Sequence, residues 1–257
     1  MDTTLLKGLG VLEALAASRS ARGVTELAQS LELTKSNVHR TLQTLTAAGY
    51  VRSGKVPGTY ECTLKLFEIA SGVVARIDVR QSADVFMQQL ARLTKETIHL
   101  SVLDGMDVIY LNKIESPHPV RAYSTIGGRA PAHCVASGKA LLAWQSDACL
   151  QQLASRLAAP TNRSIASRDA LFDELAKIRR QGFAVNRGEW RDGVGGIASI
   201  VFDLAGAPVA AIGISGPLER LRPAAIRKYS QLVVDAACGL SRSLGYSQVS
   251  YPPVVVA

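Results

Sequence analysis

The sequence has no long hydrophobic run and few cysteines, and both shortages narrow the classes of protein to which it can belong. No apolar segment approaches the roughly 20 residues that a membrane-spanning helix needs. The first ten residues carry no basic segment followed by an apolar core, so we expect no signal peptide and a cytoplasmic protein without a membrane partner. The cysteines lack the close spacing of a zinc ribbon or a disulfide framework; they are Cys62, Cys134, Cys149 and Cys238. We therefore expect reduced, mostly structural thiols.

A balanced composition and an excess of positive charge are what the sequence does contain. Of its 257 residues, 47% are hydrophobic and 19% are charged, so we expect a globular protein of two domains. The formal net charge of +8 favours a polyanionic partner. Residues 1–65 hold eight basic and five acidic side chains, an excess of three. The positive charge is thus spread along the chain. The net charge alone therefore does not identify the partner, and the positions of the basic residues must be considered.

Apolar residues in the first 50 positions recur with a helical period. One apolar stripe predicts a first helix; it contains Leu5, Leu9, Val11, Leu12 and Leu15. Residues 24–30 form a second amphipathic segment. A short turn then leads to Thr34, a suitable N-cap for a third helix over 35–48, and Gly49 suits the position that ends it. Two helices joined by a tight turn indicate a helix-turn-helix, whose second helix enters the major groove of DNA.

The third helix separates apolar from polar side chains. Val38, Leu42 and Leu45 are placed to pack inward. The outward polar residues supply groups that bond base edges and phosphates, and they are Lys35, Ser36, Asn37, His39, Arg40 and Thr44. Among these we expect Ser36, Asn37 and Arg40 to matter most. The alternative interpretation is a small helical bundle with a solvated basic face.

A hairpin follows the third helix. Residues 50–52 and 60–63 form two short strands around a loop at 53–59 that contains glycine and proline. The hairpin is the wing of a winged helix-turn-helix. Arg52 and Lys55 then lie where a wing meets phosphate or the minor groove, contributing affinity more than sequence choice.

The remaining chain alternates helical and strand patterns. Strands at 97–103 and 108–114 are joined through Asp104-Gly105, a strong hairpin signal, and strands at 197–203 and 208–215 are joined by a second short turn. The expected helices cover 64–78, 79–95, 138–144, 147–157, 167–181 and 223–244. We take the helix at 64–78 as the connection between the domains. Antiparallel strand pairs with flanking helices indicate an α+β domain.

Three stretches resemble the IclR family of transcription regulators. They are VTELAQSLELTKSNVHRTLQTLTAAGYVR at 24–52, IGGRAPAHCVASGKALLA at 126–143 and GFAVNRGEWRDGVGGIASIVFD at 182–203. The resemblance extends from Leu5 to about Gly245. It implies an α+β protein of two domains, with a winged helix-turn-helix at 1–65, a linker helix at 66–80, and a GAF-like effector-binding and oligomerisation domain at 81–250.

The resemblance also implies an effector pocket. The positions that correspond to ligand-contacting residues of the family are Ala136, Ser137, Asn186, Gly196, Gly213 and Ser215. Three depart from the family pattern, because Asn186 replaces an acid, Gly196 a Cys, Ser or Ala, and Gly213 a serine. Ala122 and Ala130 stand where relatives carry Met or Leu. We therefore expect a larger cavity and a ligand bulkier and less acidic than a two- or three-carbon keto acid. The alternative is that the small residues only permit close strand packing.

Catalytic and metal-binding interpretations have weaker support. His133-Cys134 is a candidate for nucleophilic chemistry, but adjacent residues of an extended segment point to opposite sides. We expect no catalytic residue, no metal and no cofactor, although His99, His118 and His133 keep a metal site open. Glu189 is expected to brace its loop through a salt bridge.

These expectations combine into one function. The protein is interpreted as a ligand-responsive transcription regulator of a catabolic operon, which binds a palindromic operator as a homodimer or a dimer of dimers. Its effector is expected to be a small organic acid or an aromatic catabolite. The rival interpretation is a small-molecule-binding enzyme whose N-terminal helices only dimerise. A nucleophile held against a base would favour the enzyme, and the sequence shows no such pair.

Overall fold

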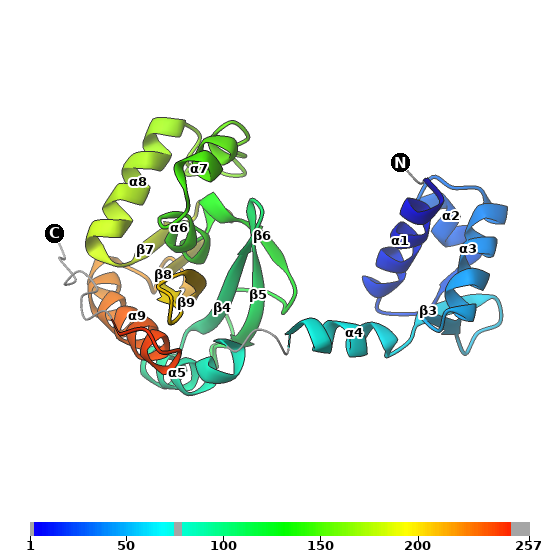
Figure 1. Ribbon diagram of the computed structural model, residues 1–257, viewed down its shortest axis with the longest axis horizontal. Coiled ribbons are helices and arrows are strands. Elements are labelled where there is room, and N and C mark those ends of the chain that lie inside the picture. The colour runs from blue at the N-terminus through cyan, green and yellow to red at the C-terminus, as the bar shows by residue number, and fades with distance from the viewer. Residues whose placement is uncertain (1–2, 75–78, 248–257) are drawn as a thin grey trace. The chain divides into compact units, whose positions relative to one another are not determined.

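The chain folds into two compact units. The computed structural model describes residues 3–74 and 79–247 (Figure 1). Contacts divide the chain into Met1–Ile77 and Asp78–Ala257. The expected connecting helix at 64–78 is present as α4 (Lys65–Val74), and its last four residues lie outside the described residues. No helix in the described part of the chain is long and apolar enough to cross a bilayer.

The N-terminal unit is a winged helix-turn-helix. Its other elements are α1 (Thr3–Ala16), β1 (Arg22–Gly23), α2 (Val24–Ser30), α3 (Lys35–Ala47), β2 (Val51–Ser53) and β3 (Thr59–Cys62). The Thr34 hydroxyl accepts a hydrogen bond from the backbone N–H of Asn37, which fixes the start of α3, and Gly49 follows its end at φ 80°. The three strands form a sheet in the order β1-β3-β2.

The first helix is less buried than its apolar stripe predicts. Val11 and Leu15 lie in the core, whereas Leu5 and Leu9 are 61% and 45% exposed. A groove of about 700 Å³ separates the first turns of α1 from α3. The stripe thus correctly predicted the helix, and the buried core of this unit includes Val11 and Leu15 from its later turns.

The C-terminal unit is built around one antiparallel sheet of six strands. Its order is β6-β5-β4-β9-β8-β7, from β4 (Thr97–Asp104), β5 (Asp107–Ile114), β6 (Arg129–Pro131), β7 (Ala184–Arg187), β8 (Val194–Phe202) and β9 (Pro208–Pro217). Two helices, α5 (Val79–Thr94) and α9 (Pro223–Ser243), pack against one face of this sheet, and α6 (Ala136–Leu142) packs against the other. Farther out lie α7 (Asp147–Ala154) and α8 (Arg168–Gln181) (Figure 1). This arrangement confirms the α+β fold with an antiparallel sheet flanked by helices.

The sequence pattern did not predict the two edge strands of this sheet or the first residues of β8. The edge strands β6 and β7 are only three and four residues long. Strand β8 begins at Val194, three residues before the expected start at 197, because Gly195 and Gly196 carry no apolar signal although they pair with β9. These additions matter, since β7 and the start of β8 supply residues to the site described next.

Candidate functional site

The exposed side of α3 carries a row of polar side chains. Ser36, Arg40 and Gln43 are all exposed, and their spacing of four and three residues places them along one stripe of the helix. Gln43 was missed in the sequence, although its position three residues after Arg40 is a usable signal. Its amide has the donor and acceptor pair that matches adenine. The stripe is therefore suited to read base edges.

Other predicted residues of α3 lie beside this row, and two of them form hydrogen bonds with Arg40. The half-buried Asn37 accepts a hydrogen bond from Arg40 Nη2 at 3.4 Å, and the Thr44 hydroxyl donates to the Arg40 carbonyl. Lys35 and His39 are exposed on the flank of the helix. The guanidinium of Arg40 is thus oriented by Asn37 before any partner is present.

The wing presents its two predicted cations differently. Arg52 lies on β2 opposite Glu61 of β3, and their side chains form an ion pair at 2.8 Å. Lys55 is exposed in the loop between these strands. Lys55 is thus free to contact a DNA phosphate. Arg52 has to leave Glu61 before it can bind one.

A small cavity opens in the C-terminal unit on the side of the sheet that α6 covers. It has a volume of about 50 Å³ and is bordered by β4, β5, β7, β8, β9, the start of α6 and the loops at 122–124 and 190–191. Seven of the eight residues predicted for the effector pocket line it, and they are Ala122, Ala136, Ser137, Asn186, Gly196, Gly213 and Ser215. We call it the central cavity.

Ala130 is the predicted residue that does not line the central cavity. It lies on β6 opposite Val108, and its side chain is buried in the hydrophobic core. The small side chains also do not produce a wide space, because the rings of His99 and Tyr110 border the cavity with their centroids 4.7 Å apart. The remaining volume holds a few water-sized groups, at about 10–15 Å³ for each. A cavity larger than those of relatives stays a prediction.

Asn186 is held in one orientation by its own loop. Its Oδ1 accepts hydrogen bonds from the backbone N–H groups of Gly188 and Glu189 at 3.0 and 2.9 Å. Because the oxygen is engaged there, the amide presents its N–H donors to the cavity. Asn186 therefore offers a ligand a hydrogen-bond donor. Asn186 thus lines the cavity as a neutral residue.

His99 and Arg191 are lining residues that sequence reasoning did not assign to the cavity. His99 Nε2 lies 2.6 Å from the Ser124 hydroxyl. Burial, with a smaller effect from the nearby Lys113, lowers the pKa of His99 to about 3, so the ring is neutral at physiological pH. Arg191 stacks over Trp190, with its guanidinium 4.3 Å from the ring centroid. Since His99 is neutral, Arg191 supplies the positive charge of the lining. A guanidinium binds a carboxylate well.

Gly213 and Gly196 have a packing role in addition to lining the cavity. A Cβ atom at Gly213 would collide with the Ile197 carbonyl and with Ala198, and one at Gly196 would lie 2.9 Å from the Ile214 carbonyl. These contacts support the alternative of close strand packing, most strongly at Gly213. Ser215 retains a polar role, since its hydroxyl donates to the Gly195 carbonyl at 3.1 Å and its oxygen still has acceptor capacity.

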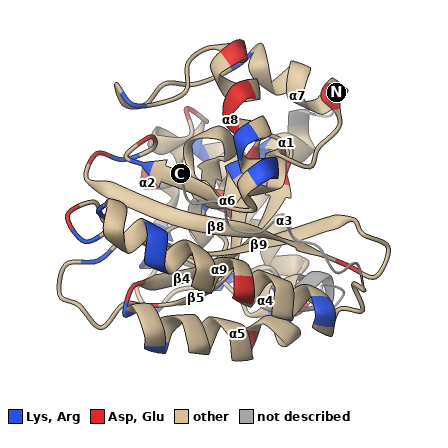
Figure 2. Cartoon of the chain, turned by 90° about the vertical axis from the view of Figure 1, so that its left-hand side faces the viewer, with Lys and Arg blue, Asp and Glu red and all other residues tan. Residues whose placement is uncertain are grey.

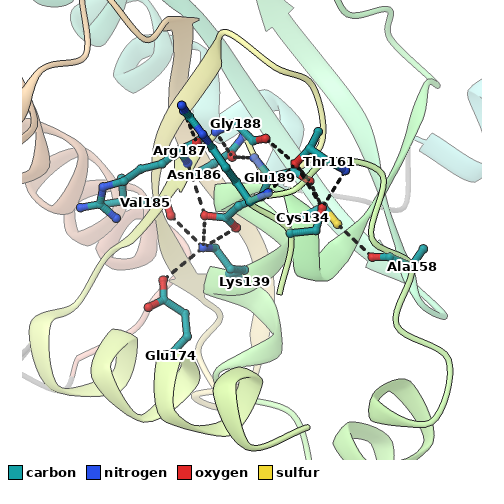
Figure 3. Close-up of polar contacts among 12 residues, drawn as sticks. Cys134, Lys139, Ala158, Thr161, Glu174, Val185, Asn186, Arg187, Gly188 and Glu189 are labelled. Atoms are coloured by element: carbon teal, nitrogen blue, oxygen red, sulfur yellow. Dashed lines mark hydrogen bonds and ion pairs between the residues drawn. The ribbon is translucent and has the colours of Figure 1, made fainter. Parts of the chain in front are cut away.

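A buried lysine holds the loop behind Asn186 (Figure 3). The ammonium of Lys139, 1% exposed, lies 2.7 Å from Glu189 Oε2 and 3.1 Å from Glu174 Oε1, and it donates to the Val185 carbonyl at 2.8 Å. We call this group the Lys139 brace. It confirms the expectation that Glu189 braces its loop, and its partner Lys139 comes from the GKA stretch 50 residues earlier.

His133 and Cys134 lie in a short 3-10 helix, Ala132–Cys134, and not in an extended segment. The argument that they point to opposite sides is therefore wrong, because His133 Nε2 and the Cys134 thiol both approach the Ala158 carbonyl. Burial raises the pKa of Cys134 to about 11, so the thiol is protonated and a poor nucleophile at neutral pH. The described residues also contain no group of three His, Cys, Asp or Glu side chains placed to share a metal ion.

Comparisons with known proteins agree on one family. The IclR helix-turn-helix model matches residues 4–54, and the model of the bacterial transcriptional regulator IclR C-terminal domain matches residues 71–242. The regulator KdgR of Escherichia coli is 38% identical over 95% of this chain and 93% of its own length. The regulator XynR of the same organism is 34% identical over 93% and 96%.

Solved structures agree with these sequence matches. The IclR protein of Thermotoga maritima has a TM-score of 0.79 at 29% identity and covers 96% of this chain and 100% of its own. An IclR homologue of Microbacterium hydrocarbonoxydans, solved with 4-hydroxybenzoate, has a TM-score of 0.82 at 24% identity and covers 94% and 99%. The helix-turn-helix, the antiparallel sheet and both family models point the same way, and the chain belongs to the IclR family of bacterial transcriptional regulators.

Proposed function

We propose that this regulator binds a palindromic operator of a catabolic operon as a homodimer or dimer of dimers, and that a small organic acid in the central cavity changes its affinity for DNA. The observation that carries the ligand assignment is the lining of that cavity. It combines one guanidinium at Arg191, an amide donor at Asn186 and the hydroxyls of Ser137 and Ser215 around about 50 Å³. A single carboxylate with one or two polar substituents matches this set.

The size of the cavity favours a small acid over an aromatic one. The 4-hydroxybenzoate bound by the Microbacterium protein has a ring that exceeds the free space beside His99 and Tyr110. An aromatic effector requires these two rings to separate. Pyruvate and 4-hydroxybenzoate are therefore the discriminating pair of ligands, and the thermal shift that each produces in the full-length protein measures which one binds.

Self-association is supported by the surface of α1. Leu5, Leu6 and Leu9 are 61%, 51% and 45% exposed on one helix. A cluster of exposed leucines is costly in an isolated protein and typical of an interface. Two copies of α3 are also the usual means by which a helix-turn-helix protein reaches adequate specificity, because a single helix reads only a few base pairs.

Two substitutions separate DNA binding from ligand binding. In a mobility-shift assay with the DNA upstream of its own gene, Arg40→Ala should weaken operator binding by at least about tenfold, since a base or phosphate contact of an arginine is lost. Ser215→Ala should leave operator binding intact and change only the response to the acid. Equal effects of both substitutions, or a wild-type protein that gives no salt-sensitive shift, would contradict the proposal.

A further inference from the structure

A second hollow lies on the opposite face of strand β7. Because side chains of a strand alternate between the two faces, Asn186 points to the central cavity and Val185 and Arg187 point away from it. A groove of about 440 Å³ begins there, between β7, α8 and the first turns of α9. Its volume lies within the roughly 300–1,000 Å³ that is usual for small-molecule sites. We call it the basic groove.

Positive charge surrounds this groove from four separate segments. The cations are Arg163 before α8, Lys177 on α8, Arg187 on β7, and Arg222 and Arg227 at the start of α9. None of the five has a carboxylate within ion-pair distance in the described part of the chain. In Figure 2 the first half of α9 likewise carries basic and no acidic residues. Several unpaired positive charges around a concave surface produce a strong positive potential there, and this potential attracts anions.

The one acidic residue in the lining does not offset this charge. Glu174 is half-buried, and its carboxylate is paired with Lys139 at 3.1 Å in the Lys139 brace. Because Lys139 is also paired with the buried Glu189, these three groups together carry one net negative charge. The five cations of the groove therefore outnumber the negative charge beside it.

The floor of the basic groove is apolar. Phe183, Val185 and Leu221 are each at most 5% exposed, and Leu218 and Ile226 are half-buried beside them. The carbonyl of Arg187 on this edge strand accepts a hydrogen bond from Arg163, and the carbonyl of Phe183 just before the strand accepts one from Gln181. These carbonyls are therefore not open for pairing with another strand. A ligand that fits has an apolar body and anionic groups at its rim.

We propose that the basic groove is a second small-molecule site, for an organic anion with two or more negative charges on a hydrocarbon body. Arginine forks bind carboxylates and phosphates with similar geometry, and several of them around one hollow favour a multiply charged ligand over a monocarboxylate. The site is separate from the central cavity and does not depend on the identity of the effector.

Calorimetric titration of the full-length protein tests this site with three probes. Phenyl phosphate and benzene-1,2-dicarboxylate carry two charges on an aromatic body and distinguish a phosphate from a dicarboxylate source, and benzoate is the singly charged control. We expect one or both dianions to bind and benzoate to bind at least about tenfold more weakly. Absence of measurable binding of both dianions at millimolar concentration overturns the proposal.

Paired variants locate the binding. The double variant Arg222→Ala, Arg227→Ala should weaken dianion binding by about tenfold or more, and Arg222→Lys, Arg227→Lys should restore part of it. The matched control Lys228→Ala, Arg242→Ala removes two charges from the same helix outside the groove and should leave affinity unchanged. Equal weakening by both alanine pairs identifies general surface charge and overturns the site. A smaller assembly of the Arg222→Ala, Arg227→Ala protein in sedimentation identifies an interface between copies and also overturns it.

Discussion

The ammonium of Lys139 is buried to 1% exposure and is stabilised by oxygens of Glu189, Glu174 and the Val185 backbone. A buried charge keeps its place only while its partners are present, and the removal of one partner leaves the other without compensation. The Lys139 brace therefore has a larger effect on stability than ion pairs on the surface, such as that between Arg52 and Glu61.

Replacement of Lys139 by methionine should destabilise the C-terminal unit by about 3 kcal/mol or more, because Glu189 is left buried without a cation. Both tryptophans of the chain, Trp144 and Trp190, lie in this unit, so urea unfolding followed by tryptophan fluorescence reports on it. Lys177→Met on the exposed side of α8 is the control and should change the free energy of unfolding by less than about 0.5 kcal/mol. A similar value for both variants would show that the brace does not stabilise the fold.

His99 makes the stability of the C-terminal unit depend on pH. Its pKa is about 3 in the folded protein, below its ordinary value of 6.5, because the ring is buried. The unfolded chain therefore binds a proton below pH 6.5 that the folded chain does not bind, and the free energy of unfolding falls as the pH falls from 6.5 towards 3. Between pH 7.5 and pH 5 this loss amounts to about 2 kcal/mol.

The His99→Gln variant isolates this contribution, since glutamine fills much of the same space and does not titrate. Wild type should lose about 2 kcal/mol more than the variant between pH 7.5 and pH 5, measured by urea unfolding at each pH. Parallel curves for the two proteins would mean that His99 is accessible to protons in the folded state.

At the level of the elements, two glycines that both lie within helices differ in the space around them. Gly10 lies within α1, and a Cβ atom there would meet nothing within 4 Å. Gly138 lies in α6, and its Cβ would collide with the backbone of Ala132 in the preceding 3-10 helix. Backbone atoms cannot rotate away, so Gly138 permits the close approach that places α6 beside the central cavity.

Substitution of each glycine by alanine should therefore change stability in opposite directions. Gly138→Ala should destabilise the C-terminal unit by about 1–3 kcal/mol, through overpacking against Ala132, in the tryptophan-monitored urea assay. Gly10→Ala should stabilise α1 by about 0.5–1 kcal/mol, because alanine costs less backbone entropy in a helix, which amide hydrogen exchange of that helix measures. Stabilisation by Gly138→Ala would contradict the close packing of α6.

Elements with long, regular patterns were predictable, and so were the short wing strands beside a clear turn signal, whereas the short strands β6 and β7 were not. The apolar period and the caps Ser167 and Gly182 locate α8, and the structure places it at Arg168–Gln181 between them. Strands β6 and β7 have too few residues for an alternation to stand out, and each is defined by pairing with a neighbour distant in the chain or separated by a loop. Such pairing is a tertiary property.

At the level of the whole molecule, the exposed leucines of α1 bear on assembly. The double variant Leu5→Glu, Leu9→Glu introduces two charges into this surface and should shift the protein to a smaller species in sedimentation velocity, since a charge buried at an apolar interface is not compensated. Operator affinity should fall in parallel, because two recognition helices no longer act together. Val85→Glu alters a residue of α5 that is 68% exposed and serves as the control, with an unchanged assembly expected.

The sequence by itself determined the winged helix-turn-helix, the α+β class of the second unit and the family, because helical periods, caps, turns and motifs are local and survive in one dimension. Only the tertiary structure decided the properties of the sites. It places His99 against Ser124 and Lys139 against Glu189, turns the oxygen of Asn186 away from the cavity, and gathers cations of four segments around the basic groove. These contacts join residues distant in sequence or depend on side-chain direction. A local sequence pattern determines neither the register between distant strands nor the rotamer of a side chain.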